Sequence, residues 1–256
     1  MPRDSFSYSI NYRPQSKKYS DLSVSSTARF SKFTIRFNHL RIDRGEVQIT
    51  IKWVSSMKIV STLEHYELLM DENNDPVQDP PQLQAYMNGW DGPIFYDFLS
   101  PNNKSILEVG VGTGRIAKEV LKRGCQYLVG IDISPKTLNR ARSNLKQYTN
   151  LELVNSDIHS FIRPNAFDAA YSILTFLHIE DKEKALFNIH NSLKENGTFV
   201  LSVSRDDEWL ECNDRKIKLY PIGLEEYIHL FLSVGFQIES IQETESKYAT
   251  IIKGRK

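Results

Sequence analysis

An acidic residue followed by three closely spaced glycines is the segment of this 256-residue chain with the clearest chemical capability. Glu108 stands two residues before Gly110, and Gly112 and Gly114 complete a Gly-x-Gly-x-Gly pattern. Glycine can adopt positive φ and lets a ligand approach the backbone closely. Dinucleotide sites use Gly-x-Gly-x-x-Gly with a pyrophosphate at the helix N-terminus, and an acid there would repel the phosphate. Glu108 suits instead a ligand that carries an ammonium and a sulfonium, because opposite charges attract.

Further residues are placed where they could bind a nucleoside. Asp132 follows the apolar segment 127–131, and its carboxylate can accept hydrogen bonds from both hydroxyls of a ribose. A dinucleotide would use an acid here too, so Asp132 does not separate the two cofactor classes. Ile133 beside it can pack on a purine face. Asp157 can accept from an adenine amino group, and a neighbouring backbone N–H, at Ile158, can donate to the ring.

Each of the three acids also has a purely structural interpretation. Glu108 could be an acid near a helix N-terminus, and Asp132 could be a solvated turn residue. Asp157 could be a turn or cap residue. The glycine spacing together with all three acids favours the binding interpretation.

These residues lie at the ends of apolar segments in a region where strands and helices alternate. The segments expected to be strands are 105–109, 127–131, 151–154, 167–173, 198–203, 236–241 and 248–252. The segments expected to be helices are 114–123, 134–145, 181–194 and 224–234. The alternation predicts an α/β fold with a doubly wound, parallel sheet. About six residues join the last two strands, too few for a parallel crossover, so these strands should be antiparallel.

In this region the sequence resembles the class I S-adenosylmethionine-dependent methyltransferases, type 11, a group that includes quinone-biosynthesis enzymes. The resemblance rests on the glycine motif, Gly130-Ile131-Asp132, Ser156-Asp157, Phe167-Asp168 and the turn at 193–197, where Thr198 replaces a second glycine. It implies a Rossmann-like, mostly parallel seven-stranded sheet in the order 3-2-1-4-5-7-6 with an antiparallel C-terminal strand. It also implies S-adenosyl-L-methionine as cofactor and methyl transfer to a small-molecule acceptor.

The acceptor side of the expected site has few distinctive residues. His178 follows the fourth strand and is the candidate general base, although a structural role such as capping the following helix is the favoured interpretation. Tyr66 and Trp90 lie upstream and could cover the cofactor or wall the substrate cavity, with core packing as the alternative. The resemblance implies that 57–103 forms a helical lid over a cofactor-binding core at 104–256.

Composition excludes several function classes. The formal net charge is zero, so no global basic field favours nucleic acid. Residues 173–176 also lack the Asn/Asp-Pro-Pro-aromatic motif often found where exocyclic amino groups are methylated, and we expect no nucleic-acid partner. No apolar run approaches the roughly 18 residues of a membrane span. Cys125 and Cys212 are isolated, which predicts neither a disulfide framework nor a metal site and fits a cytoplasmic setting. The oligomeric state is left open.

The first 56 residues differ from the rest of the chain. They contain ten basic and four acidic residues, many serines, and no sustained periodicity over 3–31. An alternating stretch at 47–53 could be a strand. We expect residues 1–56 to lie outside a methyltransferase domain at 57–256. A disordered tail or an over-long start is favoured over a transit peptide, and a basic arm that contacts an acidic partner is least favoured.

Three functional hypotheses remain open at this point. The leading one is methyl transfer to a small molecule, and the second is a cofactor-binding module of the same fold without methyl transfer. The third, an NAD-dependent dehydrogenase, is disfavoured by the glycine spacing and by Glu108.

Overall fold

The chain divides into two compact units. The computed structural model describes residues 27–30, 33–43, 46–55, 57–204 and 207–256, with side chains from residue 57 onward. The larger unit is Val60–Leu210 with Ile217–Lys256, and the smaller unit is Met1–Ile59 with Glu211–Lys216. The expected domain boundary at residue 56 stays a prediction.

The smaller unit contains an antiparallel sheet in the order β1-β2-β3. Its strands are β1 (Thr27–Phe30), β2 (Phe33–Asp43) and β3 (Glu46–Ser55). The strand expected at 47–53 lies within β3. Residues 27–30 belong to a segment expected to be loop, yet they pair with β2 through the backbone, which requires no alternation of side chains. The rest of that expectation, over 3–26 and at residue 31, lies outside the described residues.

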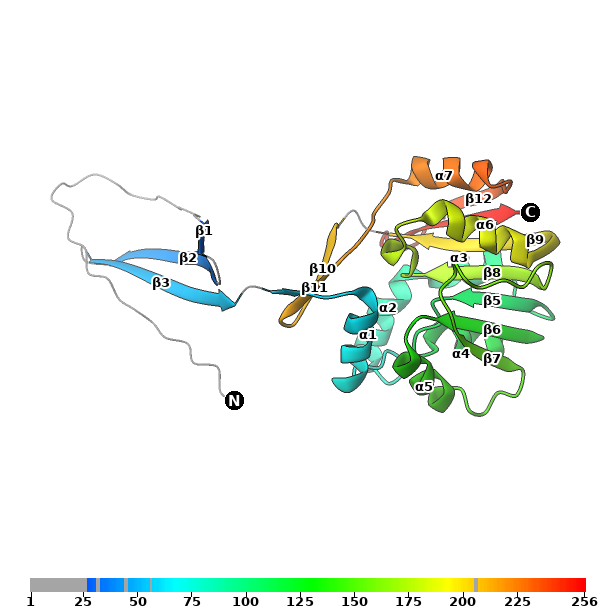
Figure 1. Ribbon diagram of the computed structural model, residues 1–256, viewed down its shortest axis with the longest axis horizontal. Helices are drawn as coiled ribbons and strands as arrows, with labels where there is room; N and C mark the ends of the chain where they lie inside the picture. Colours follow the sequence, from blue (N-terminus) through cyan, green and yellow to red (C-terminus); the bar gives the residue numbers. More distant parts are fainter. Residues whose placement is uncertain (1–26, 31–32, 44–45, 56, 205–206) are drawn as a thin grey trace. The chain divides into compact units, whose positions relative to one another are not determined.

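A seven-stranded sheet forms the centre of the larger unit, in the order β12-β13-β9-β8-β5-β6-β7 (Figure 1). Its strands are β5 (Ser105–Val109), β6 (Tyr127–Asp132), β7 (Leu151–Asn155), β8 (Phe167–Ile173), β9 (Leu193–Val203), β12 (Gln237–Glu243) and β13 (Thr250–Arg255). Strands β5 to β9 pair in parallel, and β13 is antiparallel to both β9 and β12. The expected α/β fold, its strand order and its antiparallel C-terminal strand are confirmed.

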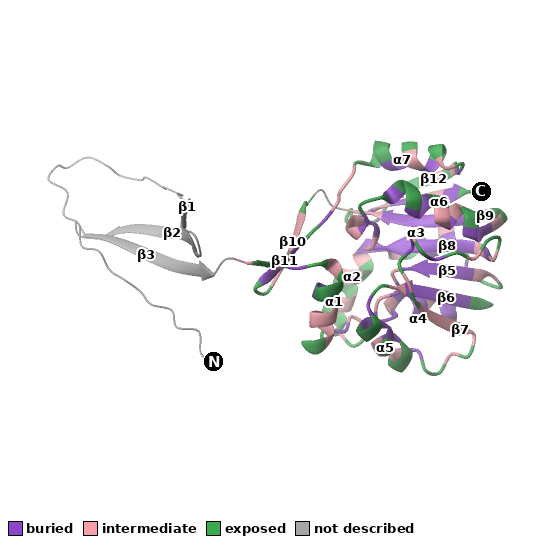
Figure 2. Ribbon diagram, in the orientation of Figure 1, coloured by how far each residue is buried: buried purple, intermediate pink, exposed green. Residues whose placement is uncertain are grey.

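Helices cover both faces of this sheet because its buried strands alternate between two apolar cores. Ile106 of β5 joins one core and Leu107 joins the other, and the buried strands form the central layer in Figure 2. One core includes side chains of α3 (Gly92–Leu99), α4 (Arg115–Lys122) and α5 (Pro135–Asn144). The other core includes side chains of α6 (Lys182–Ser192) and α7 (Leu224–Ser233).

Helices α5 and α6 begin with side-chain caps. The Ser134 hydroxyl accepts from the backbone N–H of Thr137 at 3.1 Å, and Pro135 occupies the first turn of α5. The Asp181 carboxylate accepts from the N–H of Lys184 at 3.0 Å and caps α6. The helix expected at 181–194 ends earlier, because residue 193 already belongs to β9.

The segment before the sheet contains α1 (Thr62–Asp71), α2 (Pro81–Met87), the short 3-10 helix η1 (Asn88–Trp90) and α3. Helix α3 buries Phe95 and Leu99 completely, so this part of the segment belongs to the core layer. A further small sheet has the order β10-β11-β4, with β4 (Lys58–Ile59), β10 (Trp209–Cys212) and β11 (Arg215–Lys218). These short strands carry no clear alternating pattern and were not predicted. The helices of the described residues are too short or too polar to span a membrane.

Candidate functional site

A cavity of about 410 Å³ opens at the carboxyl ends of the parallel strands. Its lining includes the ends of β5, β6 and β8, the turn after β7, and part of α1. The chain leaves β5 toward β6 on one side, while β8 pairs on the other side, so the strand order reverses here. Doubly wound folds bind ligands in the crevice that this reversal creates.

The glycine turn after β5 is shaped by two close contacts and one open position. Gly110, Gly112 and Gly114 have φ of +79°, +55° and +94°. A Cβ at Gly110 would lie 2.0 Å from Oγ1 of Thr175, and one at Gly114 would lie 2.7 Å from Cδ1 of Leu145. A Cβ at Gly112 would meet nothing within 4 Å. Gly110 and Gly112 line the cavity, whereas Gly114 caps α4 outside the lining, so a ligand can approach the backbone at Gly112.

Glu108 is a buried carboxyl that lines this cavity. Its Oε2 accepts a hydrogen bond of 2.7 Å from the Tyr171 hydroxyl. Burial raises the pKa of Glu108 to about 8, against the opposing effects of the Tyr171 bond and the Arg115 charge. A cation bound beside this carboxyl would favour its ionised form.

Arg115 is a cavity residue that the sequence reasoning missed. Its Nη1 donates to Oδ1 of Asp91 at 2.9 Å and to Oδ1 of Asn88 at 3.0 Å. Burial raises the pKa of Asp91, and the neighbouring Arg115 opposes this shift. Arg115 is the first residue of α4, directly after the glycine turn, and this position was the signal available in the sequence.

Asp132 holds the glycine turn from the end of β6. Its Oδ2 accepts from the N–H of Gly112 at 3.0 Å, and its Oδ1 accepts from the N–H of Ser134 at 2.9 Å. Burial raises the pKa of Asp132, and these backbone bonds oppose the shift. Each carboxylate oxygen can accept more than one hydrogen bond, so Asp132 keeps capacity for a ligand. Ile133 is partly exposed and also lines the cavity.

Asp157 and Ile158 line the same cavity after β7. Oδ1 of Asp157 accepts from the backbone N–H of His159 at 2.9 Å and lies 3.0 Å from the Nδ1 of that residue. Ile158 is buried and contributes to an apolar core. The glycine turn, Asp132 and Asp157 therefore follow one another along the ends of β5, β6 and β7.

Residues 107–201 match the family model described as "Methyltransferase domain". Residues 107–201 therefore form a class I S-adenosylmethionine-dependent methyltransferase domain of the type 11 group. Its sheet order, its antiparallel last strand and the position of its cavity agree with this assignment.

Similar proteins support the assignment of the methyltransferase domain. A carboxy-S-adenosyl-L-methionine synthase from Staphylococcus epidermidis is 28% identical over 131 residues, which are 50% of this chain and 57% of that protein. The chain thus spans little more than half the length of this curated relative. A putative S-adenosylmethionine-dependent methyltransferase from Listeria monocytogenes aligns with a TM-score of 0.58 and 19% identity, over 66% of this chain and 98% of that one.

Solved structures of the same fold include complexes with ligands. The 1,6-didemethyltoxoflavin-N1-methyltransferase from Burkholderia thailandensis, with bound 1,6-didemethyltoxoflavin and S-adenosylhomocysteine, aligns with a TM-score of 0.54 and 15% identity. The alignment covers 91% of this chain and 99% of that one. At this identity the likeness establishes the fold alone.

A tyrosine and a histidine meet at the β8 side of the methyltransferase cavity. The Tyr66 hydroxyl of α1 lies 2.8 Å from Nε2 of His178, which belongs to the short helix η2 (Phe176–His178) after β8. Burial lowers the pKa of His178 to about 4, and the charges of His65 and Lys182 add to the shift. Burial and the Asp132 charge raise the pKa of Tyr66. Both side chains are therefore uncharged at neutral pH.

The structure differs from two roles considered from the sequence, the capping of the following helix by His178 and the lining of the cavity by Trp90. The carboxylate of Asp181 caps α6, whereas His178 contacts Tyr66. Trp90 is buried in the core with its ring centroid 5.3 Å from that of Tyr248, and it is outside the cavity lining. Tyr66 does line the cavity, so α1 contributes directly to the wall.

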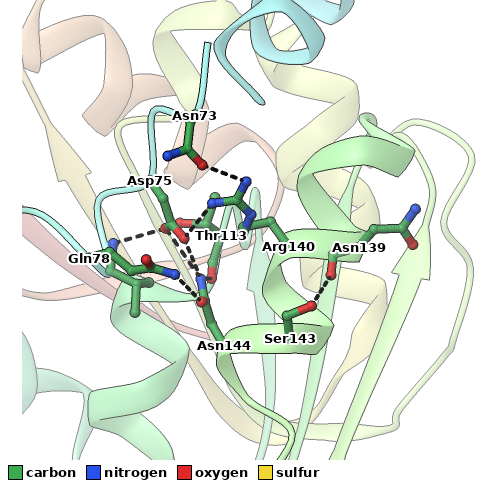
Figure 3. A network of polar contacts seen from close by, with 9 residues as sticks. Asn73, Asp75, Gln78, Thr113, Asn139, Arg140, Ser143 and Asn144 are labelled. Carbon is green, nitrogen blue, oxygen red and sulfur yellow. Dashed lines mark hydrogen bonds and ion pairs between the residues drawn. The ribbon is translucent and has the colours of Figure 1, made fainter. Parts of the chain in front are cut away.

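A polar network anchors the loop after α1 to the methyltransferase core (Figure 3). The buried Asp75 accepts from Nδ2 of Asn144 at 3.0 and 3.2 Å and from Nη1 of Arg140 at 3.3 Å. Asn144 Nδ2 also donates to the carbonyl of Thr113 at 3.0 Å. One amide on α5 thus contacts both the loop and the glycine turn.

No group of three or more His, Cys, Asp or Glu side chains suited to a metal ion was found in the part of the chain that the structure describes.

Proposed function

We propose that the protein transfers a methyl group from S-adenosylmethionine to a small-molecule acceptor by in-line displacement. The observation that carries the proposal is the row of Glu108, the glycine turn, Asp132 and Asp157 along one cavity. An acid, an open backbone and two further carboxyls match a cofactor with a cationic amino-acid end, a ribose and an adenine.

The cavity fits such a cofactor in size and chemistry. Its volume of about 410 Å³ lies in the usual range of ligand sites. Thr113 lines it and has a buried Oγ1 without a hydrogen-bond partner among the described residues. An open Cβ position at Gly112 leaves room for close approach. These features are expected of a site that a polar ligand completes.

Each residue has a distinct role in the proposed complex. Glu108 would pair with the ammonium of the cofactor, and Arg115 would pair with its carboxylate. Asp132 would accept from the ribose hydroxyls. Asp157 would accept from the adenine amino group, the backbone N–H of Ile158 would donate to the ring, and Ile133 would pack against the face of the ring.

The cofactor supplies an activated methyl group on a sulfonium. The protein then needs mainly to hold an acceptor in line and to exclude water. The acceptor would lie at the end of β8, where Thr175 and His178 line the cavity and Tyr66 closes it from α1. A dedicated general base is not required for every class of acceptor.

Calorimetry with S-adenosylmethionine and S-adenosylhomocysteine tests the cofactor assignment. If neither binds at millimolar concentration, or if NAD binds in preference, the proposal fails. Methyl-labelled cofactor is then incubated with the protein and an extract of the source cells, and mass spectrometry detects the products. Cofactor binding without any labelled product would favour the module without methyl transfer.

A further inference from the structure

The charged side chains around the cavity are mostly acidic. The acids in its lining, within the described residues, are Glu108, Asp132, Asp157 and Glu180. Apart from two histidines, the cation in the same lining is Arg115, whose guanidinium is paired with the buried carboxylate of Asp91 at 2.9 Å. The carboxylates of this lining attract a cationic cofactor, which favours the ionised form of Glu108, and together they repel an anionic acceptor.

The acceptor end combines apolar side chains with the polar side chains of Tyr66, His178, Thr62, Thr175 and Glu180. The apolar side chains that line the cavity from the segment containing α1 and α2, and from β8 and the turn after it, are Pro76, Met87, Ile173, Leu174 and Ile179. Tyr66 and His178 form the polar pair at 2.8 Å. Nδ1 of His178 is buried and finds no hydrogen-bond partner among the residues that the structure describes.

The pair keeps an unused hydrogen-bond donor in either tautomer. When the Tyr66 hydroxyl donates to Nε2, the proton of the neutral imidazole is on Nδ1. When Nε2 of His178 donates to Tyr66, the hydroxyl proton is free. Because the pair lines the cavity among several apolar side chains, it is well placed to bind a polar atom of a largely apolar acceptor.

We propose that the acceptor is a largely apolar molecule without negative charge, held at one hydroxyl or amine group by Tyr66 and His178. This inference rests on the proposed methyl transfer. It assigns two specificity-determining residues, and it excludes carboxylate, phosphate and nucleic-acid acceptors.

Charge fractionation of the source-cell extract before the reaction tests the charge of the acceptor. The extract is passed over an anion exchanger at pH 7.5, and the retained and unretained fractions are each incubated with the protein and methyl-labelled S-adenosylmethionine. We expect at least tenfold more label in the unretained fraction. Predominant labelling of the retained fraction would overturn the inference. No label in either fraction, with S-adenosylhomocysteine binding intact, would instead contradict the proposed methyl transfer and the inference that rests on it.

Two tyrosine variants test the role of the polar pair. Tyr66→Phe removes the hydroxyl and keeps the ring, while Tyr86→Phe is the matched control on an exposed position of α2 outside the cavity lining. We expect Tyr66→Phe to raise the apparent KM for the active fraction about 2- to 12-fold, as for one lost hydrogen bond. The Kd for S-adenosylhomocysteine should stay within about twofold, and Tyr86→Phe should change neither value.

A binding readout separates acceptor contact from a structural role. The imidazole ¹⁵N signals of His178 should shift when the active fraction is added to the protein saturated with S-adenosylhomocysteine. An unchanged KM in Tyr66→Phe, or unshifted His178 signals, would overturn the assignment of the pair. A loss of S-adenosylhomocysteine affinity equal to the loss of activity would do the same.

Discussion

Glu108→Gln should make the protein more stable above neutral pH while it weakens cofactor binding. The glutamine carbonyl can still accept the 2.7 Å hydrogen bond from Tyr171, so the substitution mainly removes the ionisable group. Burial raises the pKa of Glu108 from its ordinary 4.5 to about 8. Between these two values the folded state binds more protons than the unfolded state, so the stability of the native protein falls as pH rises through this window.

The magnitude follows from the width of that window. One pKa unit corresponds to about 1.4 kcal/mol. The buried carboxyl therefore lowers the free energy of unfolding by on the order of 4 kcal/mol at pH 7.5 relative to pH 4.5. Replacing the carboxyl by a neutral amide removes this cost only in part, because the amide N–H₂ group that is then buried beside Tyr171 also needs hydrogen-bond partners. We therefore expect Glu108→Gln to be about 2 to 3 kcal/mol more stable than the native protein at pH 7.5 and no more stable at pH 5.

Cofactor binding should respond in the opposite direction. An ammonium pairs with the ionised carboxylate, so native affinity for S-adenosylhomocysteine should rise between pH 6 and 8. Loss of a charge-assisted bond of about 1.5–3 kcal/mol predicts roughly 10- to 150-fold weaker binding in Glu108→Gln at pH 8. Affinity of the variant should be nearly independent of pH over this range.

Urea unfolding at several pH values and calorimetry with S-adenosylhomocysteine measure both effects. The control is Glu119→Gln, which removes a half-exposed carboxyl of α4 that pairs with Lys122. It should keep the pH dependence of the native protein. Parallel stability curves for the native protein and Glu108→Gln would refute the reasoning, as would an unchanged affinity at pH 8.

The remaining predictions concern the glycine turn, the ribose position and the anchored loop. Gly110→Ala should lower the free energy of unfolding by about 2 to 5 kcal/mol, because its Cβ clashes with Thr175 and its φ is positive. Gly112→Ala should lower the free energy of unfolding by only about 1 to 2 kcal/mol and should weaken ligand binding. Urea unfolding measures both values, and equal decreases in the two variants would contradict this. Asp132→Asn should reduce S-adenosylhomocysteine affinity roughly 10- to 100-fold by calorimetry, and native affinity would refute the ribose role. Asp75→Ala should lower the free energy of unfolding by about 2 to 3 kcal/mol and expose residues 72–80 to limited proteolysis. An equally resistant loop would count against the anchor.

The sequence predicts the larger sheet well because each strand there is a short apolar segment between clear turn or cap signals. Strands 105–109 and 167–173 match the expected bounds, and the helix expected at 134–145 is present as α5, Pro135–Asn144. The strand order came from the resemblance to the methyltransferase family. The predicted bounds are wrong where one element runs directly into the next, as at Leu193. Local periodicity alone does not decide whether such a residue continues the helix or begins the following strand.

The site was predictable to the extent that it consists of neighbours in sequence. The glycine turn and Asp132 carry spacing signals, whereas the contact between Tyr66 and His178 joins residues 112 positions apart. The sequence suggested that both Trp90 and Tyr66 could line the cavity. Only tertiary packing shows that Trp90 is buried in the core and that Tyr66 lines the cavity. Arg115 has a signal in its position, but its partner Asp91 comes from a different segment.

The Asn144 side chain has a consequence for the energetics of the whole cavity rim. Its amide hydrogens reach the Asp75 carboxylate on one side and the Thr113 carbonyl on the other. Any molecule that orders the backbone at Thr113 therefore also steadies the loop around Asp75, and thermodynamic reciprocity requires the converse to the same degree. Substitutions far along that loop can then tune affinity without touching the bound molecule.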